Sequence, residues 1–119
     1  MADPNPKKAY GDKKVPLQLV PPALEIAAAK ALGEGAGKYG PYNWRDQPVE
    51  AMTYVGAIKR HLAAWLDGED LDPESTTGKS HLDGIAGSVA ILCDAVAAGT
   101  LIDNRPPKGP APRLILTPK

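Results

Sequence analysis

The feature of this sequence that most constrains its fold is a regular apolar pattern between Ser80 and Ala98. Its apolar residues recur every three or four positions, which is the spacing of one face of an α-helix. They are Leu82, Ile85, Ala86, Val89, Leu92, Cys93 and Val96. Ser80 and Asp83 are spaced as in a capping box, and Gly99 can supply a C-terminal stop. The pattern predicts one long helix with these apolar residues on its buried side.

Small residues form a second face of this predicted helix, at Gly84, Gly87 and Ser88. A face without bulky side chains lets another backbone approach closely. We therefore expect a neighbouring helix to pack there.

Two further helices are predicted earlier in the chain. The proline pair at residues 21–22 can open the first, because the first turn of a helix needs no backbone donors, and the alanine-rich residues 23–32 follow. Four glycines within residues 33–40 are expected to end it. The second helix is predicted over about residues 48–66. Its buried side would consist of Met52, Val55, Leu62 and Leu66.

Composition limits the remaining fold. The chain has 119 residues, of which 5% are aromatic and none is phenylalanine, so a core of alanine and aliphatic residues suits closely packed helices. We expect one all-α domain over residues 1–119, a bundle of about three to four helices. Residues 1–20 are predicted to be an extended arm without helix, and residues 103–119 a proline-rich tail. The apolar run 114–116 in that tail would pair as an edge strand or strap a neighbouring subunit.

Charge, size and cysteine content narrow the function. Lys plus Arg and Asp plus Glu each total 14, and this zero net charge gives no support for electrostatic capture of nucleic acid. The single cysteine, Cys93, excludes a disulfide framework within one chain. No apolar run approaches the length of a membrane span, and no apolar signal segment opens the chain. We expect a soluble cytoplasmic protein that contacts neither membrane nor nucleic acid and, because a small chain gains by burying surface between subunits, a homodimer or homotetramer.

An acidic connector joins the last two predicted helices and separates His61 from His81. Closely spaced carboxylates are what hard cations such as Mg²⁺ and Mn²⁺ select, so the connector predicts a metal site. The alternative is an acidic, solvated connector that is capped at both ends. If the preceding helix continued to Glu69, then Glu50, His61 and Glu69 would face a common pocket. The carboxylates of this region are Asp67, Glu69, Asp70, Asp72, Glu74 and Asp83.

Cations and aromatic rings lie near these acids in the sequence. Lys59 and Arg60 can bind a phosphate, lysine as a point charge and arginine as a planar fork. A second segment can stack on a base, contact a purine edge and hold phosphates. Its residues are Lys38, Tyr39, Tyr42, Asn43, Trp44 and Arg45. The alternative for these aromatic side chains is that they plug the end of the helix bundle. The acids and the cations, which lie side by side in the sequence, indicate a nucleotide-phosphate site.

Four segments within about residues 12–94 form a specific combination: K-K-V-P-L-Q-L-V-P-P, G-A-G-K-Y-G-P-Y-N-W-R, R-H-L-A-A-W-L-D-G-E-D-L-D-P-E-S and S-H-L-D-G. They resemble successive blocks of the phage dATP/dGTP diphosphohydrolase family, which is related to the all-α MazG-like nucleoside triphosphate pyrophosphohydrolases. The resemblance implies an enzyme that uses two or more Mg²⁺ or Mn²⁺ ions to cleave dATP and dGTP to the monophosphate and pyrophosphate in the host bacterial cytoplasm. It also implies that dGMP feeds 2-aminoadenine nucleotide synthesis, while removal of dATP keeps adenine out of the genome.

The resemblance implies roles for individual residues. Those implied at the nucleotide are Lys38, Asn43, Trp44 and Arg45, and those implied near its phosphates are Arg60 and His61. Lys59, beside Arg60, would bind phosphate through its own charge. Those implied at or next to the metal ions are Glu69, Asp72, Glu74 and His81. Either Glu69 or Glu74 would orient the attacking water, with Arg60 and His61 as the other catalytic groups. This chain differs from the family pattern in the longer spacer 76–80 and in Gly84, which stands where the family has a second histidine. The alternative metal ligands are Glu34, Glu50 and Asp83.

Two other functions fit parts of the sequence. A non-catalytic helical phage module could bind nucleic acid or a protein through the aromatic segment, and it would need no metal. A metal-dependent phosphatase acting on monophosphates would release orthophosphate instead of pyrophosphate.

Overall fold

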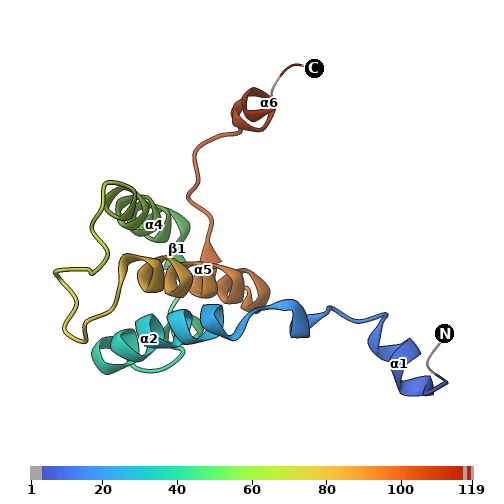
Figure 1. Cartoon of the computed structure of the whole chain (residues 1–119). Helices are drawn as coiled ribbons and strands as arrows, with labels where there is room; N and C mark the ends of the chain where they lie inside the picture. The colour runs from blue at the N-terminus through green and yellow to red at the C-terminus, as the bar shows by residue number, and fades with distance from the viewer. Residues whose placement is uncertain (1–3, 117, 119) are drawn as a thin grey trace.

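Three long helices form the body of the computed structural model, which describes residues 4–116 and 118. They are α2 (Pro22–Tyr39), α4 (Ala51–Leu66) and α5 (His81–Ala98), and α5 lies between the other two (Figure 1). The expected all-α class is therefore confirmed. The shorter elements are α1 (Pro6–Gly11), a 3-10 helix (Leu17–Leu19), α3 (Asn43–Asp46), β1 (Val49–Glu50), β2 (Leu101–Ile102) and α6 (Ala111–Ile115).

The predicted central helix is confirmed, including both of its ends. Ser80 is the N-cap of α5: its hydroxyl accepts a hydrogen bond from the Asp83 N–H at 3.1 Å, and the Asp83 carboxylate accepts one from the Ser80 N–H at 2.9 Å. Gly99 ends the helix with φ 75°, in the left-handed region that favours glycine. Local sequence signals were therefore sufficient to place this element.

The small-residue face of α5 packs closely, as predicted. A Cβ atom built on Gly87 would lie 2.5 Å from the Cβ of Ala31 on α2, and one built on Gly84 would lie 2.7 Å from Nε2 of His61 on α4. Atoms cannot approach this closely without repulsion, so only glycine permits the observed spacing at either position. These two glycines set how near α2 and α4 come to the central helix.

The predicted apolar side of α5 is only partly buried, which corrects the sequence prediction. Ile85, Ala86 and Leu92 are half-buried, whereas Leu82 is 46%, Val89 42% and Val96 64% exposed. Cys93 is exposed as well. The reason is that α2 and α4 pack against the small-residue face of the helix. The buried apolar side chains among the described residues are Trp44, Ala51 and Ala95.

The predicted buried side of α4 is wrong for three of its four residues. Met52, Leu62 and Leu66 are exposed, and only Val55 is half-buried. Tyr54, Ile58 and His61 are the half-buried residues at helical spacing. The helix itself begins at Ala51, a little later than predicted, because Val49–Glu50 form β1. β1 pairs in parallel with β2, with Val49 opposite Leu101 and Glu50 opposite Ile102.

The glycine-rich segment does not end α2 where the sequence predicted. The helix continues through Gly33, Gly35 and Gly37 and ends only at Gly40, which has φ 86°. Each internal glycine costs about 1 kcal/mol relative to alanine in a helix. Packing of α2 along α5 outweighs this cost.

The two arms extend away from the body (Figure 1). The radius of gyration is 18.0 Å, against about 13.5 Å for a compact chain of this length. The N-terminal arm nevertheless contains α1, contrary to prediction, because the Asn5 side chain accepts the Lys7 N–H and Pro6 occupies the first turn. In the tail, Leu114 and Ile115 belong to α6 and form no edge strand. The predictions for residues 1–3, 117 and 119 lie outside the described residues.

One described helix, α5, is long and apolar enough to cross a membrane by length and composition. This corrects the expectation that no apolar run approaches that length. In the structure α5 is the central helix of the body, with α2 and α4 packed against it and the buried polar residues His81 and Asp83 at its start.

Candidate active site

A cleft of about 490 Å³ opens between α4, the end of α2 and the acidic connector. It gathers many of the residues that the sequence indicated. Its polar lining consists of Lys38, Arg60, His61, Glu69, Asp72, Glu74, Lys79 and His81. Cations, carboxylates and both histidines therefore share one concave surface.

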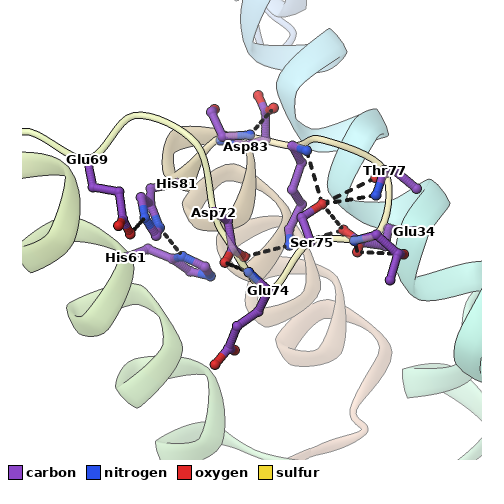
Figure 2. A network of polar contacts seen from close by, with 12 residues as sticks. Glu34, His61, Glu69, Asp72, Glu74, Ser75, Thr77, His81 and Asp83 are labelled. Carbon is purple, nitrogen blue, oxygen red and sulfur yellow. Dashed lines mark hydrogen bonds and ion pairs between the residues drawn. The ribbon is translucent and has the colours of Figure 1, made fainter.

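A row of hydrogen bonds joins Glu69, His81 and His61 along one side of the cleft (Figure 2). Nε2 of His81 lies 2.7 Å from Oε1 of Glu69, and the Nδ1 atoms of the two histidines lie 2.8 Å apart. α4 does not continue to Glu69, so the helical arrangement of Glu50, His61 and Glu69 that was considered from the sequence does not form. The helix ends at Leu66, and the chain reverses at Gly68 with φ 103°, which brings Glu69 to His81 by another route. Glu50 lies before the opposite end of α4, away from this row.

The hydrogen bonds give each ring a polar partner. Nε2–H of His81 donates to the Glu69 carboxylate, and the Nδ1 atom of one histidine donates to the Nδ1 atom of the other, in the direction that the ring tautomers set. Burial is the main cause of the lowered pKa of His61. The charge of Asp72 acts to raise this pKa, and repulsion from His81 lowers it further. His61 is therefore neutral near pH 7, and its ring lies against Gly84.

Lys79, which lines the cleft, bridges two carboxylates. Its ammonium lies 3.0 Å from Glu34 and 3.0 Å from Asp72, and all three side chains are at most 15% exposed. Burial acts to lower the pKa of Lys79, but the two carboxylates outweigh it and raise that pKa, so the ammonium stays charged. Burial likewise acts to raise the pKa of Asp72, but the Glu74 N–H and Lys79 outweigh it and lower that pKa. The connector is thereby fixed to α2.

Glu34 is the most strongly bound carboxylate of this group. It accepts the Thr76 N–H at 2.8 Å, the Thr76 hydroxyl at 3.1 Å and the Ser75 hydroxyl at 3.1 Å (Figure 2). The backbone hydrogen bond from Thr76, together with Lys79, lowers its pKa to about 2 against the effect of burial. Sequence reasoning considered Glu34 only as an alternative metal ligand and missed Lys79. The lysine at the end of an acidic connector was the available signal, because a buried carboxylate needs a cation.

Three charged side chains of the cleft make few hydrogen bonds or ion pairs within the described chain: Arg60, Lys38 and Glu74. The Arg60 guanidinium lies over Gly56, where an added Cβ would be 3.0 Å from Nη1, and no acid pairs with it in the described part of the chain. Lys38 approaches Glu34 only to 3.9 Å. The Glu74 carboxylate is exposed and points away from Asp72 (Figure 2). These groups are free to contact a charged ligand.

Apart from Lys38, the predicted aromatic segment lies outside this cleft, and Trp44 and Arg45 are bound to α5. The Trp44 indole N–H donates to Asp94 at 2.7 Å, and Arg45 donates to the same carboxylate at 2.8 and 2.9 Å. These bonds lower the pKa of Asp94 to about 2. Trp44 is 6% exposed, so it fixes α3 against the central helix, as the plugging alternative stated. Asn43 begins α3 beside it.

Two further predicted site residues are also placed elsewhere. Lys59 lines a separate groove of about 830 Å³ beside the C-terminal arm, together with Arg105 and Lys108. Asp83 is buried and serves the capping box of α5. Neither side chain lines the cleft.

No three His, Cys, Asp or Glu side chains of the described residues are grouped closely enough to hold a metal ion by themselves. This arrangement still fits Mg²⁺, because that ion usually keeps several waters and binds through one or two carboxylates together with substrate phosphates. Glu69 and Glu74 present carboxylate oxygens at the cleft, so the donor chemistry suits a hard divalent cation.

Lowering the pH should remove the stabilisation that Glu34 provides. Its pKa of about 2 in the folded protein lies below its ordinary 4.5, so the ionised group stabilises the fold fully above pH 4.5, and this contribution is lost as the pH falls towards 2. We expect Glu34→Gln to lower the free energy of unfolding at pH 7 by about 1–3 kcal/mol and by less at pH 3. Urea unfolding at both pH values measures the difference. The exposed Glu50→Gln is the control, and a deficit that does not depend on pH would contradict the assignment.

Comparison with known proteins places the chain in a family. The model of the family described as dATP/dGTP diphosphohydrolase, N-terminal, matches residues 4–105. The chain is also similar to a dATP/dGTP diphosphohydrolase of Salmonella phage PMBT28, with 31% identity over 97 residues. That alignment covers 82% of this chain but 30% of the relative, so the chain spans less than a third of that protein. No solved structure matches the chain. Because the family model matches residues 4–105, which are most of the chain and include every residue that lines the cleft, the chain belongs to the dATP/dGTP diphosphohydrolase N-terminal family.

Proposed function

We propose that the cleft hydrolyses dATP and dGTP to the nucleoside monophosphate and pyrophosphate. The single observation that carries this proposal is the convergence of free cations, carboxylates and paired histidines on one concave surface. A triphosphate needs cations to bind it, and water attack on phosphorus needs groups that orient the water. The name of the phage relative and the family supply the substrate class.

Arg60 and Lys38 are the proposed triphosphate ligands. Arginine matches phosphate oxygens with a planar pair of N–H donors, while lysine acts as a compact point charge. Both line the cleft, and Arg60 has no acid partner among the described side chains, so neither must leave a strong ion pair before binding substrate.

Glu69 or Glu74 is proposed to orient the attacking water and accept its proton. The water oxygen forms a bond to the α-phosphorus, the bond from that phosphorus to the bridging oxygen breaks, and pyrophosphate leaves with the electron pair. The row of hydrogen bonds through His81 to His61 holds the Glu69 carboxylate in place.

Two or more Mg²⁺ or Mn²⁺ ions are part of the proposal. Glu69 and Glu74 would hold them, with Asp72 and His81 next to these acids in the same cleft. Bound divalent ions would neutralise developing charge on the phosphates and lower the pKa of a bound water.

The place of this reaction in the cell is a further part of the proposal. We propose that the chain acts in the cytoplasm of an infected bacterium, where dGMP would supply the synthesis of 2-aminoadenine nucleotides and removal of dATP would exclude adenine. These two consequences rest on the resemblance and on the phage origin of the relative.

A homodimer or homotetramer is proposed from the exposed apolar surface. An apolar groove of about 600 Å³ runs along α2 and α5, and the side chains of Leu24, Leu82 and Val89 on it are 51%, 46% and 42% exposed. Uncovered apolar surface on this scale commonly marks an interface. We expect light scattering to give a dimer or larger species for the native chain and a monomer for Leu82→Glu. The exposed arm variant Val15→Glu should keep the native mass, and a monomeric native chain at micromolar concentration would contradict the proposal.

Product analysis tests the function directly. The purified protein is incubated with each dNTP and Mg²⁺ or Mn²⁺, with and without EDTA, and the products are separated by ion-exchange chromatography. We expect metal-dependent release of dAMP and dGMP together with pyrophosphate. Orthophosphate instead of pyrophosphate would indicate a phosphatase, and no turnover by a folded protein would favour the non-catalytic binding module.

A further inference from the structure

The Lys79 ammonium occupies an unusual position between two buried carboxylates. Oε2 of Glu34 and Oδ2 of Asp72 both lie 3.0 Å from its Nζ, and the side chains of the two acids are only 5% and 10% exposed. Lysine is seldom this buried unless it is paired, and here one cation serves two anions. The group therefore retains one negative charge more than positive.

The two carboxylates are held in place independently of Lys79. The other oxygen of Glu34, Oε1, accepts the Thr76 N–H at 2.8 Å, and the other oxygen of Asp72, Oδ1, accepts the Glu74 N–H at 2.9 Å. Each acid therefore has one oxygen bound to the backbone and one directed at the ammonium (Figure 2). Removal of the lysine charge would leave two fixed carboxylate oxygens around one point.

That arrangement is also what a hard divalent cation requires. Such ions are bound by one or two carboxylates together with neutral oxygens, and the Ser75 hydroxyl already lies 3.1 Å from Oε2 of Glu34. Asp72 and Lys79 line the cleft, so water and ions can reach this point from the solvent side.

We propose that the Lys79 ammonium is a built-in cation that takes the place of a divalent ion between Glu34 and Asp72. The part of this inference that concerns catalysis rests on the proposed function. If Lys79 fills the position between Glu34 and Asp72, then Glu69 and Glu74 would hold the exchangeable ions of the cleft.

Replacing the lysine should create an ion site that can be measured without any substrate. The side chain of methionine in Lys79→Met keeps much of the lysine's length and removes its charge. We expect this variant to melt below the native protein in EDTA, because two buried carboxylates then repel each other. Addition of 10 mM Mg²⁺ should raise its Tm by about 5 °C or more, while the native protein shifts by clearly less. Equilibrium dialysis with Mn²⁺ should count one more bound ion per chain in the variant.

Two controls isolate the site. Lys38→Met removes a lysine that lies 3.9 Å from the same glutamate, and it should gain no ion. The double variant Lys79→Met with Asp72→Asn should lose the gain, because one of the two carboxylates is then neutral.

Three results would overturn the proposal: equal Mg²⁺ shifts in the native and Lys79→Met proteins, the same gain in the double variant, or a Lys79→Met chain that stays unfolded at saturating Mg²⁺. The hydrolysis assay on the native protein is separate. An inactive native protein whose Lys79→Met variant gains an ion would refute the proposed function alone, and an active protein without that gain would refute this inference alone.

Discussion

Glu69→Gln is expected to lower kcat for dATP hydrolysis by about 100-fold or more while leaving the protein folded. Loss of a group that orients the attacking water or binds an ion removes several kcal/mol of transition-state stabilisation. Glutamine keeps an acceptor oxygen for His81 Nε2–H, so the row of hydrogen bonds to His61 can persist and only the charge is lost. Because the Glu69 side chain is 52% exposed, the substitution should have little effect on stability. Steady-state kinetics and circular dichroism on one preparation measure both quantities.

Asp70→Asn is the matched control for this experiment. Asp70 is the next acid in the connector, but it does not line the cleft, so the loss of its charge should change kcat less than about twofold. If Glu69→Gln retained most of the native activity, Glu69 would be removed from the proposed site and Glu74 would remain as the candidate.

Gly87→Ala is expected to lower the free energy of unfolding by about 1–3 kcal/mol, although alanine is the better helix former by about 1 kcal/mol. The added Cβ would lie 2.5 Å from the Cβ of Ala31, so α2 and α5 must move apart. The separation would also displace Glu34, which holds the connector to α2. Urea unfolding measures the change, and a larger loss is expected for Gly87→Val.

Gly37→Ala provides the opposite case on α2. Gly37 is exposed and helical, and no atom lies within 4 Å of a Cβ built there, so the substitution should raise the free energy of unfolding by up to about 1 kcal/mol. If both glycine variants changed stability in the same direction, the close contact at Gly87 would not be what sets the spacing of the helices.

Local signals in the sequence were sufficient for α5 but not for its partners. The capping box and Gly99 depend on residues that are adjacent in the chain, and both were predicted correctly. The buried side was predicted wrongly because the apolar pattern identifies the large side chains and not what covers them. In the described chain α2 and α4 pack against the small residues, and Leu82 and Val89 stay exposed.

The residue types of the cleft were predictable from the sequence, but their pairing was not. Glu69 reaches His81 because Gly68 reverses the chain, whereas the helical spacing suggested a different partner set. Lys79 meets Glu34 across 45 positions, and such a contact depends on how α2 crosses α5. Trp44 was equally suited to stack on a base or to plug the bundle. Its position depends on Asp94, a carboxylate within the mostly apolar helix α5.

The short parallel pair of β1 and β2 has a mechanical consequence for the cleft. It joins Val49 to Leu101, and the Met52 N–H also donates to Asn104 at 2.9 Å, so the segment from β1 to β2 is closed at its base. Most of the cleft, from Arg60 to His81, belongs to this closed segment. Because its two ends are fixed to each other, tension on the C-terminal arm is borne by the strand pair before it reaches the histidines and acids. A fusion partner attached at the C-terminus should therefore leave this part of the cleft undisturbed.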